Sequence, residues 1–273
     1  MLKDYLGKDF SSLKDKKLFL FDMDGTIYLG NKLFKGVTEL LDGITVNGGR
    51  YVFITNNSSK SVKDYVKKLD ALGIKTTEEN FFTSSQAAAM LFKEKFNDKL
   101  IYCQGSNSFV LEMKSAGLNV TESYDQNAGA ILVGFDTSLT AEKMFTTSKM
   151  LTVLKDVPYY ATNPDWVCPV EFGYIPDCGS MCFGYEKATG RTPIFIGKPK
   201  PDMINTVCKK FGVDKSKTVV LGDRIYTDIA SGVNAGVDTV LVLSGEATMD
   251  DYNKSSVKPT FVLESVDRLN ELK

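Results

Sequence analysis

Residues 18–26 have the sequence LFLFDMDGT, in which four large apolar residues, Leu18–Phe21, end at two aspartates, Asp22 and Asp24. A short apolar run that stops in turn residues is typical of a strand buried on both faces, as in parallel sheets. In open α/β sheets, ligands bind just beyond the carboxyl ends of such strands. Both aspartates are therefore expected at a ligand-binding edge.

Two other structures share the D-x-D-G pattern. A calcium-binding EF-hand loop would need glycine in place of Ile27 and glutamate in place of Leu33, so the sequence excludes it. An ordinary acidic turn after a strand remains an alternative for this stretch taken alone. Only the rest of the chain argues against it.

The composition is that of an ordinary globular protein. Of 273 residues, 43% are hydrophobic and 25% charged, which argues against disorder and allows one large domain or two moderate ones. The net charge of −1 argues against a nucleic-acid-binding surface. No apolar run is long enough to span a bilayer, and the first residues lack the apolar region of a secretory signal. We therefore expect a cytoplasmic protein with neither nucleic acid nor membrane as a partner.

Histidine is absent, and the five cysteines form no C-x-x-C pair. The absence of histidine excludes Ser-His-Asp hydrolysis, histidine phosphotransfer and histidine-ligated zinc. Acid–base chemistry must then come from carboxylates, lysine, tyrosine or cysteine. The odd number of scattered cysteines predicts reduced thiols.

Three more predicted strands, residues 50–54, 193–196 and 218–221, end in polar residues and are expected in the same sheet as Leu18–Phe21. Their ends supply Thr55, Asn56, Lys198, Asp223 and Asp228. Helical patterns alternate with these strands, which predicts an α/β fold with a Rossmann-like, doubly wound parallel sheet. For Thr55 and Asn56 alone, capping of the next helix is an alternative to ligand binding.

Residues 85–187 repeat the alternation of strands and helices as a separate unit. Predicted strands of this unit are 100–103, 130–134 and 159–161, and the first sheet is expected to resume near Lys187. We therefore predict a catalytic core formed by residues 1–84 and 188–273, with residues 85–187 as an inserted α/β cap domain.

If the four strand ends converge, three carboxylates share one site with a single lysine. Two like charges about 4 Å apart repel by roughly 4 kcal/mol at an effective dielectric of 20, and Lys198 cannot balance Asp22, Asp223 and Asp228. A hard divalent cation is needed, and oxygen ligands suit Mg²⁺. Beside a bound phosphate group, Asp22 is then a nucleophile that forms an aspartyl-phosphate, and Asp24 can protonate the leaving group.

Four segments together resemble the motifs of the haloacid dehalogenase superfamily of phosphatases: residues 22–26, 55–57, 198–199 and 222–228. Their order, with about 140 residues between the second and the third, is similar to the subgroup with a large inserted α/β cap. Three cap segments, residues 134–136, 161–165 and 188–191, resemble the NagD / p-nitrophenyl phosphatase branch.

By this resemblance, Asp22 is the nucleophile and a Mg²⁺ ligand, and Asp24 is the acid/base, with its backbone carbonyl also on the metal. Asp223 is a further Mg²⁺ ligand, and Asp228 supports the metal site directly or through water. The resemblance assigns phosphate binding to Gly25, Thr55, Asn56, Asn57 and Lys198. In the cap, Asp165, Asp177 and Cys178 are candidates for setting substrate specificity.

The sequence thus predicts a Mg²⁺-dependent phosphatase that hydrolyses small phosphomonoesters such as sugar phosphates, nucleoside monophosphates or p-nitrophenyl phosphate. A phosphotransferase or mutase of the same superfamily is the enzymatic alternative. A non-catalytic phospho-receiver or sensor is the other alternative, although it would need neither an acid at Asp24 nor a cap. The expected partner is a small phosphorylated metabolite, and a homo-oligomer is left open.

Overall fold

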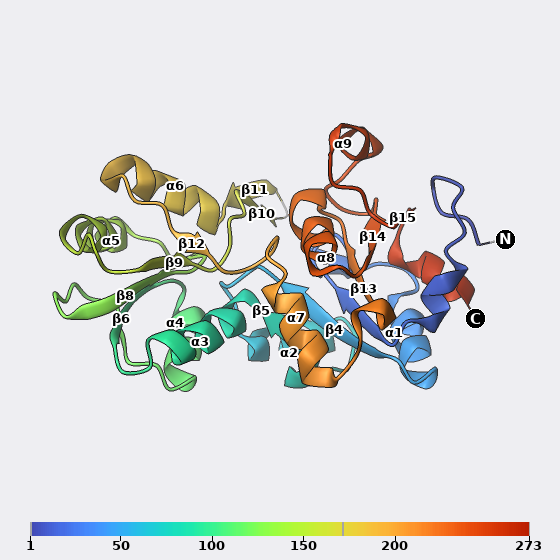
Figure 1. Ribbon diagram of the computed structural model, residues 1–273, viewed down its shortest axis with the longest axis horizontal. Coiled ribbons are helices and arrows are strands. Elements are labelled where there is room, and N and C mark those ends of the chain that lie inside the picture. The colour runs from blue at the N-terminus through green and yellow to red at the C-terminus, as the bar shows by residue number, and fades with distance from the viewer. Residues whose placement is uncertain (1, 171, 273) are drawn as a thin grey trace. The chain divides into compact units, whose positions relative to one another are not determined.

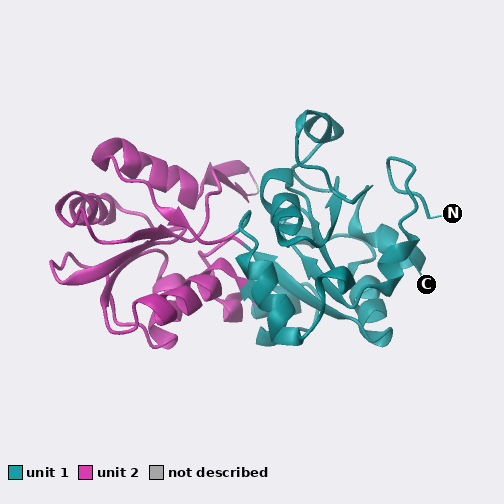
Figure 2. Cartoon of the chain, in the orientation of Figure 1, with its two compact units in different colours: residues 1–55, 66–82, 198–273 teal, residues 56–65, 83–197 magenta. Residues whose placement is uncertain are grey.

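The computed structural model describes residues 2–170 and 172–272. These residues form two compact units, drawn in different colours in Figure 2. The first unit comprises residues 1–55, 66–82 and 198–273, and the second comprises residues 56–65 and 83–197. No described helix is long and apolar enough to cross a membrane.

The first unit is built on a six-stranded sheet of order β15-β14-β13-β1-β4-β5 (Figure 1). Its strands are β1 (Leu18–Phe21), β4 (Arg50–Thr55), β5 (Phe81–Thr83), β13 (Thr218–Gly222), β14 (Asp238–Val242) and β15 (Phe261–Leu263). Strand β1 pairs in parallel with both β13 and β4, and all four of its residues are buried. In the register, Phe21 lies opposite Leu221 on one side and Phe53 on the other. Past this row, β13 continues to Gly222 and β4 to Thr55, so the three central strands end close to one another. The predicted Rossmann-like α/β fold is confirmed.

Helices connect these strands. They are α1 (Val37–Val46), α2 (Val62–Ala71), α7 (Asp202–Phe211), α8 (Ala230–Ala235) and α9 (Met249–Lys254), and the first turn of α2 belongs to the second unit. The sequence predicts a helix from Leu33 to about Val46, which is longer than the observed α1. Residues 28–33 instead form a small hairpin of β2 (Tyr28–Leu29) and β3 (Lys32–Leu33). The helix begins only after Gly36, whose φ of 75° lies in the left-handed region.

The second unit has a five-stranded parallel sheet of order β12-β9-β8-β6-β7. Its strands are β6 (Leu100–Gln104), β7 (Val120–Thr121), β8 (Ala128–Val133), β9 (Tyr159–Ala161) and β12 (Ile194–Phe195). Its helices are α3 (Ser84–Lys95), α4 (Asn107–Ser115), α5 (Ala141–Val153) and α6 (Cys178–Thr189). A hairpin of β10 (Val167–Val170) and β11 (Gly173–Pro176) precedes α6.

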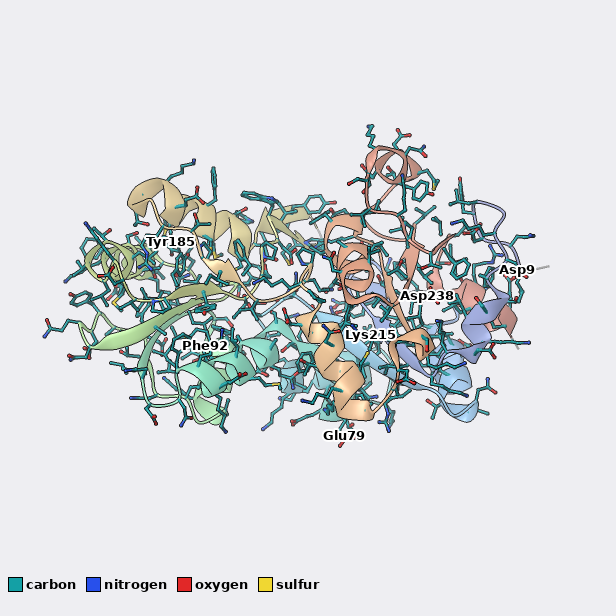
Figure 3. The ribbon with its side chains drawn as sticks, in the orientation of Figure 1. Asp9, Glu79, Phe92, Tyr185, Lys215 and Asp238 are labelled. Atoms are coloured by element: carbon teal, nitrogen blue, oxygen red, sulfur yellow. The ribbon has the colours of Figure 1, made fainter. Side chains whose placement is uncertain are left out.

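Alternate residues of the second sheet pack into two separate hydrophobic clusters. Ile101 and Leu132 join the cluster that contains Phe92 of α3, whereas their neighbours face a second cluster that contains Tyr185 of α6. Figure 3 shows Phe92 and Tyr185 on opposite sides of this sheet. The sheet is therefore covered by helices on both faces, as expected for parallel strands.

The sequence-based prediction that residues 193–196 return the chain to the first sheet is wrong. Strand β12 pairs in parallel with β9 of the second sheet, with Ile194 opposite Tyr160 and Phe195 opposite Ala161. Phe195 packs against the second unit's cluster around Tyr185. A strand at a sheet edge has only one neighbour, and its local sequence does not identify that neighbour.

The second unit extends beyond the predicted cap, residues 85–187. It also takes in residues 56–65 and continues to residue 197. Its assignment as a cap stays a prediction. The cysteines are free, as their number and spacing predict.

Candidate active site

Lys198 joins two carboxylates of the first unit, those of the predicted nucleophile Asp22 and of the predicted metal-site residue Asp228. Its Nζ donates to Asp22 Oδ1 at 2.7 Å, to Asp228 Oδ1 at 2.5 Å and to the carbonyl oxygen of Ile54 at 3.1 Å. The lysine side chain is only 2% exposed. Because Asp22 follows β1 and Ile54 lies at the end of β4, the ammonium group connects the ends of neighbouring strands. The structure therefore confirms that these predicted strand ends meet.

Asp228 is held on both of its carboxylate oxygens. Besides the bond from Lys198, its Oδ2 accepts from the backbone N–H of Arg224 at 3.1 Å. The residue lies in a single π-helical turn, Ile225–Ile229, directly before α8, and it is 1% exposed. Turns of this kind are frequent at functional sites. Here the turn places a buried carboxylate beside the ammonium group of Lys198.

Asp223 follows β13, and its carboxylate lies very close to the backbone of Gly25 and Gly245. Its Oδ2 accepts from the N–H of Glu246 at 2.7 Å, and its Oδ1 accepts from Thr26 Oγ1 at 3.4 Å. A Cβ atom on either Gly25 or Gly245 would collide with its carboxylate. Gly25 also has a φ of 88°, which disfavours any other residue. Both glycines are therefore needed for the close approach to Asp223.

Carboxylate oxygens of Asp22, Asp223 and Asp228 lie within 4.8 Å of one another. Burial, and next the charge of Asp228, raises the pKa of Asp22 well above its ordinary value. The same two causes raise the pKa of Asp223 to about 6. Burial works to lower the pKa of Lys198, but the charges of Asp22 and Asp228 outweigh it, and the pKa is raised. When all three carboxylates are ionised, the single ammonium group leaves two negative charges uncompensated.

This arrangement fits a hard divalent cation. The donor atoms are all oxygens, their separation allows one ion to reach all three carboxylates, and the excess negative charge requires compensation. A bound cation would favour the ionised forms of Asp22 and Asp223 and so oppose the effects of burial and of the Asp228 charge, which raise their pKa values. Both oxygens of Asp228 accept hydrogen bonds of 2.5 and 3.1 Å, whereas Asp223 Oδ1 accepts only the long bond of 3.4 Å from Thr26. Asp22 and Asp223 are therefore the better direct ligands.

Asp24 has different partners from Asp22. Tyr28 donates its hydroxyl to Asp24 Oδ2 at 3.2 Å, and Lys68 Nζ lies 3.7 Å from Asp24 Oδ1. The same Lys68 ammonium is 3.6 Å from the centre of the Tyr28 ring, within range of a cation–π interaction. Nothing in the sequence around Lys68 of α2 indicates this role, whereas Tyr28 lies only four residues after Asp24.

The predicted phosphate-binding residues are divided between the two units. Thr55 ends β4 in the first unit, next to β1, and is 5% exposed. Asn56 and Asn57 follow directly and belong to the second unit. The side chain of Asn57 closes a turn, because its Oδ1 accepts from the N–H of Ser59 at 3.0 Å and from its hydroxyl at 2.7 Å.

The three cap candidates make structural contacts within the second unit. Asp177 caps α6, accepting from the N–H of Cys178 at 2.5 Å. Cys178 is fully buried, with its Sγ 3.6 Å from the carbonyl oxygen of Val133. Asp165 is 3% exposed, and its N–H donates to Asn163 Oδ1 at 3.1 Å. A role of these residues in substrate specificity stays a prediction.

Comparison with known proteins identifies the family. A haloacid dehalogenase-like hydrolase model matches residues 19–119, and a HAD-hydrolase-like model matches residues 195–269. An acid sugar phosphatase of Staphylococcus aureus is 32% identical over 259 residues, which cover 95% of this chain and 97% of that protein.

Solved structures agree with this result. The 4-nitrophenylphosphatase of Thermotoga maritima has a TM-score of 0.89 and 36% identity, covering 95% of this chain and 98% of its own. A glycerol phosphate phosphatase of Mycobacterium tuberculosis, solved with magnesium, has a TM-score of 0.87 and 26% identity, covering 94% and 77%. The chain therefore belongs to the haloacid dehalogenase-like hydrolases, in the NagD / p-nitrophenyl phosphatase branch that its motifs predict.

Proposed function

We propose that this protein is a Mg²⁺-dependent phosphatase that hydrolyses small phosphomonoesters through an aspartyl-phosphate on Asp22. The observation on which the proposal rests is the group of three carboxylates, the partly exposed Asp22 with the buried Asp223 and Asp228, beside the ammonium of Lys198. A divalent ion held by Asp22, Asp223 and the backbone carbonyl of Asp24 would supply the positive charge that attracts a phosphate dianion. Asp228 would hold Lys198 in place and contact the ion directly or through water.

In the first step, a carboxylate oxygen of Asp22 attacks phosphorus, and the bond from phosphorus to the leaving oxygen breaks. Asp22 Oδ1 is held by Lys198, whereas no hydrogen bond reaches Oδ2 from the residues that the structure describes. We therefore assign the attack to Oδ2. Asp24 gives its proton to the leaving oxygen, which departs as an alcohol.

In the second step, water attacks phosphorus, and the bond between phosphorus and Asp22 breaks. Asp24, now ionised, takes a proton from the water, so inorganic phosphate leaves and both aspartates return to their starting forms. Tyr28 and Lys68 hold the carboxylate of Asp24 for this exchange. Lys198, Gly25, Thr55, Asn56 and Asn57 would hold the phosphate oxygens as their charge redistributes.

The relatives support a proposal for the substrate class. Proteins similar to this chain are named acid sugar phosphatase, 4-nitrophenylphosphatase and glycerol phosphate phosphatase. We infer that this chain takes small phosphorylated metabolites of the same kind, with nucleoside monophosphates as further candidates. We also infer that the second unit is the family's inserted cap, and that it sets the preference among them.

Hydrolysis of p-nitrophenyl phosphate tests the proposal. The wild-type protein should be active with Mg²⁺ and inactive in EDTA, and Asp22→Ala should reduce kcat by about 10⁴-fold or more. Asp136→Asn, which changes a buried carboxylate of the second unit, is the matched control and should remain active. Activity of Asp22→Ala within about tenfold of wild type would disprove the nucleophile assignment.

Adding a high concentration of an acceptor alcohol distinguishes hydrolysis from phosphoryl transfer. A phosphatase should release mainly inorganic phosphate, whereas a phosphotransferase should form mainly the alkyl phosphate.

A further inference from the structure

Residues 56–59, which begin the segment after β4, are held by side chains from other parts of the second unit. The carbonyl oxygen of Asn56 accepts from Asn163 Nδ2 and from Ser84 Oγ, both at 2.6 Å. Ser58 Oγ lies 2.8 Å from Thr162 Oγ1. The second unit therefore fixes this segment through several buried hydrogen bonds.

Among the side chains that hold this segment, Asn163 has an amide group whose orientation is fixed by its own hydrogen bonds. Asn163 follows β9, is 0% exposed, and its Oδ1 accepts from the N–H of Asp165 at 3.1 Å. The amide group must therefore direct Nδ2 toward the carbonyl oxygen of Asn56. The side chain of Asn56 is also closely packed: its Oδ1 lies so near Gly197 that a Cβ atom at that position would collide with it.

Fixing the carbonyl of Asn56 also fixes the next N–H. A trans peptide is planar, and its C=O and N–H groups point in opposite directions. The N–H of Asn57 therefore points away from Asn163. The side-chain donor of Asn57 is already engaged, because its Nδ2 donates to Cys168 Sγ at 3.7 Å while its Oδ1 accepts from Ser59. The backbone N–H of Asn57 is therefore the better phosphate donor.

We propose that Asn163 is a positioning residue for phosphate binding: by holding the carbonyl of Asn56, it orients the N–H of Asn57 toward the substrate phosphate group. This inference rests on the proposed phosphatase function. Donors that are oriented before the substrate arrives lose no binding energy to reorganisation. Without Asn163, the peptide between residues 56 and 57 would turn more freely, and phosphate would bind more weakly.

Two variants test the role of Asn163. Asn163→Asp keeps the shape but replaces the donor by an acceptor, and Asn163→Ser removes the reach of the amide. Both should raise the KM for p-nitrophenyl phosphate and the inhibition constant of inorganic phosphate by about tenfold. The Mg²⁺ concentration for half-maximal activity should stay within about twofold of wild type, because the carboxylate cluster belongs to other chain segments.

Thr147→Val is the matched control for damage to the second unit. Thr147 is 0% exposed, and its hydroxyl donates to Gln104 Oε1 at 2.7 Å without contacting residues 56–59. This variant should lower the melting temperature and leave both phosphate constants unchanged. If neither Asn163 variant folds, Ser84→Ala removes the other bond to the same carbonyl and should raise the phosphate constant several-fold.

Calorimetric titration with inorganic phosphate in the presence of Mg²⁺ separates this inference from the proposed function, since it needs no turnover. Weaker phosphate binding by folded Asn163 variants would support the positioning role even if no substrate were hydrolysed. Phosphate affinity within about twofold of wild type in the folded variants would overturn the role, and so would a wild-type protein that binds no phosphate. A wild type that binds phosphate but hydrolyses no phosphomonoester would instead disprove the proposed function.

Discussion

The two parallel sheets of this molecule have similar architecture but different chemistry at their carboxyl ends. The first sheet ends in Asp22, Asp223 and the following Asp228, with Lys198 as their one cationic partner within hydrogen-bond distance among the described residues. After β8 of the second sheet, Asp136 is paired one to one with Lys143, whose Nζ lies 2.8 Å from Asp136 Oδ2.

The difference lies in charge balance. In the second unit, the Asp136 carboxylate is satisfied by Lys143 and by the N–H and hydroxyl of Ser138, at 2.9 and 2.8 Å. In the first unit, negative charge exceeds positive charge by two, and the pKa of Asp223 is raised to about 6. An unbalanced cluster of this kind fits the bound cation that we propose, whereas the balanced pair stabilises the fold.

Replacing Lys198 in the first unit and Lys143 in the second tests this difference in charge balance most strongly. Lys198→Met should reduce kcat/KM by about 10³-fold and destabilise the metal-free protein by about 3–5 kcal/mol, because buried carboxylates lose their partner. Lys143→Met should cost only about 1–2 kcal/mol, since Lys143 is 29% exposed and Asp136 keeps its bonds from Ser138. Phosphatase assays and urea unfolding in EDTA measure both effects. Equal losses of activity in the two variants would remove the distinction.

Mg²⁺ should stabilise the first unit through the carboxylate cluster. At 100 times its dissociation constant, the ion should add about 2.7 kcal/mol to the free energy of unfolding. Asp223→Asn should lose most of this gain and should be more stable than wild type in EDTA, since it removes a repelling charge. Asp136→Asn should keep the gain. Thermal unfolding with and without Mg²⁺ provides the measurement, and an undiminished shift in Asp223→Asn would argue against this metal site.

Gly25 and Gly30 both have a positive φ, so alanine variants at the two positions separate a collision with Asp223 from the cost of the left-handed backbone. Gly25→Ala would drive a Cβ atom into the Asp223 carboxylate, whereas Gly30→Ala, at a φ of 59°, meets nothing within 4 Å. Both variants should lose about 1 kcal/mol of stability from the left-handed conformation. Only Gly25→Ala should also lose activity, by about 30-fold, or about 2 kcal/mol. Comparable activities of the two variants would mean that Asp223 does not need its present position.

The smallest expected effect concerns the support of Asp24. Tyr28→Phe removes one hydrogen bond to Asp24 and should reduce kcat/KM for glycerol phosphate by about three- to tenfold. The loss should be smaller with p-nitrophenyl phosphate, because its leaving group needs less protonation. Tyr51→Phe, in β4 of the same unit, is the control and should change neither value. An equal loss on both substrates would indicate that Tyr28 supports the fold rather than the proton transfer.

The sequence predicts the central part of the first site well. Leu18–Phe21 is a buried parallel strand, and Asp22 does meet Lys198 across 176 residues of chain, with Asp228 bound to the same lysine. Strand ends are predictable here because apolar runs that stop at charged residues have few other structural explanations.

The rest depends on contacts that local patterns do not encode. The edge strand β12 contains only two residues, and nothing in them specifies the second sheet rather than the first. Lys68 approaches Asp24 only because of the way α2 packs, and Asn163 finds the carbonyl of Asn56 across 107 residues. Such pairings follow from tertiary packing, so the sequence indicates the residues of the carboxylate cluster but not those that position the site.

The most direct test of the account is a search for the phosphorylated enzyme in Asp24→Asn. With p-nitrophenyl phosphate, the first step needs little help from an acid, but hydrolysis of the aspartyl-phosphate lacks its base. Rapid mixing with Mg²⁺ should therefore release a burst of about one p-nitrophenolate per active site, followed by slow turnover. Mass spectrometry should find one added phosphoryl group on Asp22. Steady turnover from the start with no phosphoryl group on Asp22 would contradict the central claim.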